Sequence, residues 1–298
     1  MEKNMSDLNL NERVVKTLEI VEKRGYNLTI KKLSEVLIGG EIDKEELKRK
    51  IKNFKNVNFN GTFVATSGNL NTKKCMKRMI TNDNLQKIYT KIAEEYTTDY
   101  QKFCPWVKCI MVSGSMSTEG LGENDDIDFN LIVEDDSKYT SYLLSILLSL
   151  KYSIKYRNQF KEKYLRFLTK VICISVIWEE HQVLPFIRRD DQIAYELLNS
   201  KVLYNQKFFN NMLDHNLWLK NWFPQVFKKG STIKKDILSK HDKRILPNII
   251  ENISRKIMCA LYIIIKTSRL KNIVQKERMS LCEKVKHPYG LFDIPKKK

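Results

Sequence analysis

The chain has 298 residues, and 42% of them are apolar, which is enough to fill more than one hydrophobic core. Its formal net charge of +18 favours an anionic partner such as a nucleic acid, although a lysine-rich background composition accounts for part of that charge. Six scattered cysteines without a CxxC pair argue against a zinc site or a disulfide framework, and no apolar stretch is long enough to span a membrane. We therefore expect a reduced, cytoplasmic protein with no membrane partner.

Residues 11–66 predict three short helices and a hairpin. The helices are NERVVKTLEIVEKRG, TIKKLSEVL with Thr29 as its N-cap, and DKEELKRKIKNF with Asp43 as its N-cap. VNFNGTFVAT then alternates apolar and polar residues around Asn60-Gly61, a strong hairpin signal. This order predicts a winged helix-turn-helix, whose basic third helix is either a DNA-recognition helix or the solvated face of a packing module. Its basic residues are Lys44, Lys48, Arg49, Lys50 and Lys52.

The middle of the chain predicts a long helix over 72–104 and then a small mixed sheet. The strands are WVKCIMV, DIDFNLIV and KVICISVIW, and the apolar helix YTSYLLSILLSL lies between the second and the third. After His181 the pattern predicts helices only, with breaks near Asn205 and between Pro224 and Gly230. We therefore expect an α+β protein. Its three parts would be a winged helix-turn-helix (1–70), a mixed-sheet core (71–182) and an all-helical C-terminal region (183–298).

The stretch VSGSMSTEGLGENDDIDFNLIV carries the candidate chemistry. Gly114 follows the first strand and lets the backbone approach a ligand, and Ser115 begins a turn whose N–H groups favour anions. Asp126 and Asp128 are one residue apart at the start of a strand, so their side chains share a face and repel each other unless a cation lies between them. Mg²⁺ (or Mn²⁺) is the expected cation, because it prefers oxygen ligands and shares them with substrate phosphates.

This spacing of an apolar strand, Gly114-Ser115, a loop and Asp126-Ile-Asp128 resembles the nucleotidyltransferase superfamily of DNA polymerase β. The resemblance implies transfer of a nucleoside monophosphate from a nucleoside triphosphate (NTP) to an acceptor hydroxyl, with release of pyrophosphate. Gly114 and Ser115 would hold the triphosphate, and Asp126 and Asp128 would bind the metal. The order of the three parts, with IAYELLNSKVLYN and HPYGLFDIP, also resembles bacterial nucleotidyltransferase-domain proteins that carry an N-terminal winged helix.

The third carboxylate that most active members of the superfamily supply from a later strand is missing from KVICISVIW. Ser175 stands where an aspartate would be expected. Glu179 and Glu180 follow that strand, and they are either the replacement for the missing carboxylate or two exposed acids that open a loop. An alternative function is therefore a catalytically degenerate nucleotide-binding regulator, which would bind DNA or a protein through its winged helix.

The segment 151–170 is strongly basic, with interleaved aromatic residues. It predicts either a track for an RNA or DNA backbone or a helix or hairpin with a solvated cationic face. Lys155 or Arg157 could equally reach the triphosphate. The acceptor itself, whether a small molecule, RNA or protein, leaves no signature in the sequence.

Overall fold

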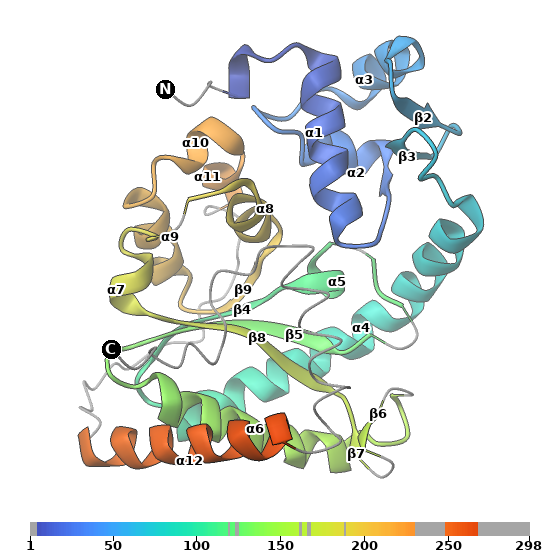
Figure 1. The fold of residues 1–298 in the computed structure, drawn as a ribbon. Helices are drawn as coiled ribbons and strands as arrows, with labels where there is room; N and C mark the ends of the chain where they lie inside the picture. The colour runs from blue at the N-terminus through green and yellow to red at the C-terminus, as the bar shows by residue number, and fades with distance from the viewer. Residues whose placement is uncertain are drawn as a thin grey trace.

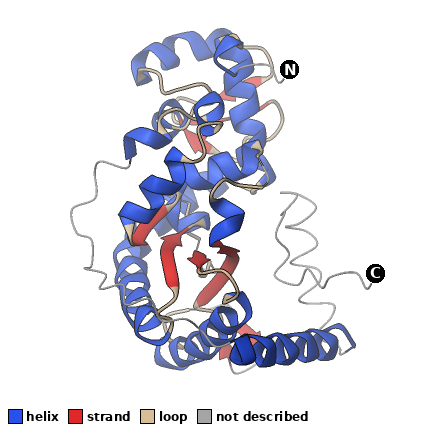
Figure 2. Ribbon diagram, turned by 90° about the vertical axis from the view of Figure 1, so that its left-hand side faces the viewer, coloured by secondary structure: helices blue, strands red, loops and turns tan. Residues whose placement is uncertain are grey.

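The computed structural model describes residues 5–118, 120–122, 125–160, 163–165, 168–187, 189–229 and 248–267. These residues form a mixed α and β structure in which helix predominates (Figure 1). The N-terminal elements lie at one end, a four-stranded sheet lies in the middle, and α6 (Lys138–Lys155) and α12 (Asn248–Thr267) lie at the other end (Figure 1 and Figure 2). No helix within these ranges is both long and apolar enough to cross a membrane.

Residues 5–66 form helices around a small antiparallel sheet of order β1-β3-β2. Thr29 and Asp43 cap α2 and α3, as the sequence predicts, because their side chains accept hydrogen bonds from Lys32 N and Glu46 N. The hairpin predicted around Gly61 is also confirmed, since β2 pairs antiparallel with β3. The elements are η1 (Met5–Asp7), α1 (Leu10–Lys23), β1 (Leu28–Thr29), α2 (Ile30–Glu35), α3 (Lys44–Lys50), η2 (Ile51–Asn53), β2 (Val57–Phe59) and β3 (Phe63–Thr66).

The long helix predicted over 72–104 is α4 (Thr72–Phe103), and the three strands predicted after it are also present. The four-stranded sheet has the order β8-β5-β4-β9, in which β5 and β8 run parallel and the other neighbours run antiparallel. Its elements and their neighbours are β4 (Val107–Val112), α5 (Gly114–Ser117), β5 (Ile127–Val133), α6 (Lys138–Lys155), β6 (Lys163–Leu165), β7 (Leu168–Thr169), β8 (Ile172–Glu179) and β9 (Lys201–Tyr204).

Alternate residues of β4 point into two different cores. Ile110 and Val112 pack with buried residues of α4 and α6, whereas Cys109 and Met111 pack with the C-terminal helices. The second of these cores continues without interruption into the N-terminal helices. The sheet is therefore covered on both faces, and one face shares its core with the first 66 residues.

Among the residues that the structure describes, the regular elements of the C-terminal region are helices apart from β9. The helices are α7 (Glu180–Val183), α8 (Asp191–Asn199), α9 (Gln206–Asp214), α10 (Leu219–Trp222), α11 (Val226–Lys229) and α12 (Asn248–Thr267). The expectation of an all-helical region is thus wrong at Lys201–Tyr204, which pair antiparallel with β4. The motif HPYGLFDIP lies outside the described residues.

Backbone hydrogen bonds and a carboxylate join distant parts of the chain. Gly39 N donates to Trp222 O (2.7 Å), which ties the N-terminal part to α10. Glu251 of α12 accepts hydrogen bonds from Tyr139 N (2.7 Å) and Thr140 N (2.9 Å) and so caps the first turn of α6. The last described helix therefore stabilises a helix that packs under the sheet.

Candidate active site

The residues singled out in the sequence meet where β4 ends and β5 begins. Because these strands are antiparallel, with Val112 opposite Phe129, the turn after β4 lies beside the first residues of β5. Ser113 N donates to Asp128 O (2.9 Å) and fixes that register. The structure thus brings Gly114 against Asp128.

Gly114 is in the left-handed region (φ +63°) and touches the Asp128 carboxylate. A Cβ atom at position 114 would lie 2.1 Å from Asp128 Oδ2, which is far inside van der Waals contact. Glycine is therefore required here both for its backbone conformation and for its lack of a side chain.

Ser115 lies in the first turn of α5, half-buried. Its backbone carbonyl accepts hydrogen bonds from Gly120 N (2.9 Å) and Thr118 Oγ1 (3.3 Å), which fold the following loop back on the turn. Its hydroxyl makes no hydrogen bond with another described residue and is available to a ligand.

Asp126 and Asp128 form a group with Cys173, in which the potential ligand atoms all lie within 4.8 Å of one another. Asp126 is 9% exposed. Cys173 belongs to β8 and stands directly opposite Asp128 in the parallel pairing. Two carboxylates suit a hard cation such as Mg²⁺ or Mn²⁺, whereas the thiol is a softer ligand.

The surroundings of Asp128 oppose its ionisation. Burial and the neighbouring charge of Asp126 raise the pKa of Asp128 to about 8, although a hydrogen bond from Ser175 Oγ to its Oδ1 (2.9 Å) opposes the shift. A divalent cation would relieve the repulsion between the two carboxylates and would favour the ionised form. The pair is therefore suited to a cation on electrostatic grounds.

Lys170 provides a positive charge beside the pair. Its Nζ lies 3.1 Å from Asp126 Oδ2, and both side chains are largely shielded from solvent. Burial lowers the pKa of Lys170, but the Asp126 carboxylate outweighs that effect and holds the pKa above its ordinary value. In the sequence, Lys170 was recognised only as part of the basic segment 151–170, and its position beside the aspartates was not predicted.

Glu179 and Glu180 are not brought to the Asp126–Asp128 pair. β8 runs parallel to β5, so Glu179 lies opposite Val133, at the far end of both strands. There Glu179 accepts a hydrogen bond from Asp136 N (3.0 Å), and Glu180 lies 3.8 Å from Lys108. Of the two alternatives that the sequence leaves open for these glutamates, their positions match acids at the far end of the strand rather than a replacement for the third carboxylate. The β8 residues beside the pair are Cys173 and Ser175.

A buried polar network reaches the site from the opposite core. Asn130, on the same strand as Asp128, donates to Glu196 Oε1 (3.1 Å), and Glu196 forms an ion pair with Arg24 at the end of α1. Tyr26 and Tyr195 join their hydroxyls beside it (3.0 Å). The sequence pattern did not reveal this network, because its members lie on three distant segments and match no spaced motif.

Two lysines of the segment 151–170 form ion pairs with α4. Lys151 lies 2.8 Å from Asp99, and Lys155 lies 2.6 Å from Glu95, which is an arrangement of helix packing. This part of the segment therefore matches the helix-face interpretation better than a continuous nucleic-acid track. Residues 161–162 and 166–167 lie outside the described residues.

A scan against protein-family models found no matching family. A search of curated proteins found no match either.

Proposed function

We propose that the protein is a Mg²⁺-dependent (or Mn²⁺-dependent) nucleotidyltransferase that transfers a nucleoside monophosphate from an NTP to an acceptor hydroxyl. The observation that carries the proposal is the contact of Gly114 with Asp128, in which the turn after β4 lies against a carboxylate pair at the start of β5. This is the arrangement that the resemblance to the polymerase β superfamily implies. On this proposal residues 1–70 are a winged helix-turn-helix and residues 71–182 are the catalytic core.

Each residue of the site has a role that its surroundings support. Asp126 and Asp128 would hold the cation, which when bound stabilises negative charge on the reacting phosphate and on the leaving pyrophosphate. Gly114 and Ser115 would hold the triphosphate through the turn backbone and the Ser115 hydroxyl. Lys170 keeps a positive charge beside the carboxylates.

The acceptor would have to react with little help from a general base. The Ser175 hydroxyl donates a hydrogen bond to Asp128 and cannot serve as a general base. The carboxylate of Glu196 is already engaged by Arg24 and Asn130. We therefore expect an acceptor hydroxyl that ionises readily.

The test is transfer of label from α-³²P-labelled NTPs to small-molecule, RNA and protein acceptors in the presence of Mg²⁺. The wild type should label one acceptor class and release pyrophosphate, whereas Asp126→Asn and Asp128→Asn should lose at least about a hundredfold in rate, because each removes a metal ligand. Asp136→Asn is the matched control, since Asp136 is exposed and has a left-handed backbone conformation (φ +59°) that asparagine tolerates. Equal labelling by all four proteins would remove these aspartates from the mechanism.

A second candidate is a regulator that binds a nucleotide without transferring it. The observation that favours it is that the β8 residue in contact with Asp128 is a serine, Ser175, rather than an acid. Such a protein would bind duplex DNA through the exposed lysines of α3, with an affinity that falls steeply as salt rises. Pyrophosphate release together with no DNA binding at low salt would exclude it.

A further inference from the structure

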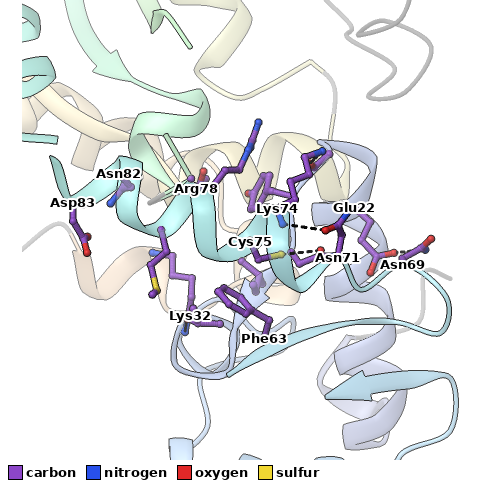
Figure 3. Close-up of a pocket in the computed structure, with 18 residues that line it drawn as sticks. Glu22, Lys32, Phe63, Asn69, Asn71, Lys74, Cys75, Arg78, Asn82 and Asp83 are labelled. Atoms are coloured by element: carbon purple, nitrogen blue, oxygen red, sulfur yellow. Dashed lines mark hydrogen bonds between the residues drawn. The ribbon is translucent and has the colours of Figure 1, made fainter. Parts of the chain in front are cut away.

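A cavity of about 500 Å³ lies between the N-terminal part of the chain and the start of α4 (Figure 3). The end of α1, the β1 segment and α2 form one side, and the first three turns of α4 form the other. Thr118 and Gly120, from the loop that follows Ser115, also line it. None of the carboxylates of the Asp126–Asp128 pair lines this cavity, so it is a separate feature.

The cavity carries a surplus of positive charge. Lys32, Lys74 and Arg78 line it, against two acids, Glu22 and Asp83. The carboxylate of Glu22 is already engaged, because it accepts hydrogen bonds from Thr66 N, Thr66 Oγ1 and Asn69 Nδ2. With three cationic and two anionic side chains, the lining keeps one positive charge in excess, which favours an anionic ligand.

The side chain that most favours an anionic ligand in this cavity is Arg78. It is half-buried, and it has no hydrogen bond or carboxylate partner among the described residues. Its Nη1 lies 4.0 Å from the point at which a Cβ on Gly120 would stand, so the guanidinium reaches the loop beside Ser115. A partly desolvated guanidinium favours an anionic partner, and its planar donors match a phosphate well.

The other cations are close to the same space. Lys32 is 12% exposed at its side chain, and its nearest carboxylate, on Glu35, is 3.9 Å away. Lys74 Nζ is 3.5 Å from Gly25 O, a weak contact that a stronger acceptor would replace. Three cationic side chains therefore line the same cavity.

The remaining lining suits an organic group rather than a bare ion. Phe63 presents an aromatic side chain, and Asn27, Asn71 and Asn82 present amides. Asn82 is buried, and its amide oxygen is 3.5 Å from Leu121 N, while its amide nitrogen donates to no described residue. A volume of about 500 Å³ is within the ordinary range for small-molecule sites.

We propose that this cavity binds a small organic phosphate of mononucleotide size, with its phosphate on Arg78 and Lys74. The proposal goes beyond the transferase function, because it requires neither the metal nor the aspartate pair. A ligand bound here would contact Thr118 and Gly120, whose hydrogen bonds to Ser115 O shape the turn at the active site.

The experiment is isothermal titration calorimetry of the full chain in EDTA, with the four ribonucleoside monophosphates and inorganic phosphate as probes. At least one monophosphate should bind, and inorganic phosphate should bind at least about tenfold more weakly because it lacks the organic group. Lys74→Gln/Arg78→Gln should weaken monophosphate binding by at least about tenfold. Arg78→Lys should bind the monophosphate more tightly than this double variant but more weakly than the wild type, since a lysine keeps the charge but loses the planar donors.

Lys73→Gln/Lys87→Gln is the matched control. Both lysines are exposed residues of α4 outside the cavity, so the control removes the same charge from the same helix. It should bind the monophosphate as the wild type does. Equal weakening in the two double variants, or no binding of any monophosphate at millimolar concentration, would overturn the proposal.

The readout is independent of catalysis. EDTA removes the metal, so Asp126→Asn should bind the monophosphate as tightly as the wild type, whether or not label transfer is ever observed. Thermal unfolding of each variant checks that a loss of affinity is not a loss of folding.

Discussion

Asp128 is a carboxyl group whose ionisation is opposed by burial and by the charge of Asp126. Ser175 and Lys170 favour the charged form, but the resulting pKa is still about 8. The folded protein without a divalent cation should therefore keep a proton on this pair at neutral pH.

The pH dependence of stability follows from that proton. Between the ordinary pKa of an aspartate and about 8, the folded state binds a proton that the unfolded state has lost, so the free energy of unfolding falls as pH rises. In EDTA, the wild type should lose about 1–3 kcal/mol more than Asp128→Asn between pH 6 and pH 8, as measured by urea unfolding. Parallel profiles for the two proteins would contradict the shift, and Asp136→Asn should follow the wild type. Mg²⁺ should stabilise the wild type more at pH 8 than at pH 6, because less of the Asp128 carboxyl is protonated at pH 8 and fewer protons have to be displaced.

A substitution of Gly114 tests its close contact with Asp128. Gly114→Ala should destabilise the protein by about 2–4 kcal/mol, because it adds a clash with Asp128 to the cost of a left-handed alanine. Gly61→Ala is the control, since Gly61 also has a positive φ (+94°) but no atom within 4 Å of the new Cβ, and it should cost about 1–2 kcal/mol. Urea unfolding measures both. Most of the excess cost at position 114 should disappear in an Asp128→Ala background, where only the Cβ of residue 128, at 3.1 Å, stays close to the new methyl group. An equal cost in both backgrounds would show that the Asp128 carboxylate does not clash with it.

Among the elements, those with strong local signals were predictable from the sequence. Side-chain caps at Thr29 and Asp43 and the hairpin at Gly61 depend on neighbouring residues alone. β9 was missed because the four residues that form it directly follow a helix, and their strand conformation depends on pairing with the distant β4.

The candidate site was predictable only on the β4–β5 side. The sequence left open whether Glu179 or Glu180 reaches the pair. They do not approach it, because β8 follows β5 through the crossover helix α6, and that connection makes the two strands parallel. The start of β8, with Lys170 and Cys173, therefore meets the start of β5. The direction of the strand, rather than the presence of an acid, decides which residues reach the site.

The Arg24–Glu196 pair joins α1 to α8, and Glu196 also accepts a hydrogen bond from Asn130 of β5. Glu196→Gln should cost about 2–4 kcal/mol, because it leaves a shielded guanidinium without its carboxylate. In a double-mutant cycle with Arg24→Met, measured by urea unfolding, the two changes should be coupled by about 1–3 kcal/mol. Additive effects would contradict a direct interaction. The exposed Glu35→Gln, which removes a 3.9 Å pair with Lys32, should cost less than about 1 kcal/mol.

At the scale of the whole molecule, the N-terminal helices and one face of the sheet share a single core. Leu37 and Met111, far apart in the sequence, belong to the same buried cluster as Trp178. The described parts should therefore unfold together rather than one after another.

Leu37→Ala tests this cooperativity. Leu37 is fully buried, and its truncation should cost about 2–5 kcal/mol. Circular dichroism of the helices and fluorescence of the tryptophans, which lie in or beside the sheet and the C-terminal helices, should move to the same lower midpoint. An N-terminal transition that separates from the tryptophan signal would show that the shared core does not couple the parts. Lys31→Ala, an exposed change on α2, should leave both midpoints nearly unchanged.

The sheet order β8-β5-β4-β9 also has a consequence for how the protein is made. A ribosome delivers β4 and β5 first, so Gly114 and Asp128 can meet while the chain is still being synthesised. Lys170 and Cys173 arrive only after the crossover helix, and Glu196 and β9 arrive later still. A nascent chain that stops before Lys170 would hold the two aspartates without the lysine that offsets the charge of Asp126, so the site gains its positive charge only when synthesis has passed the crossover helix and Lys170.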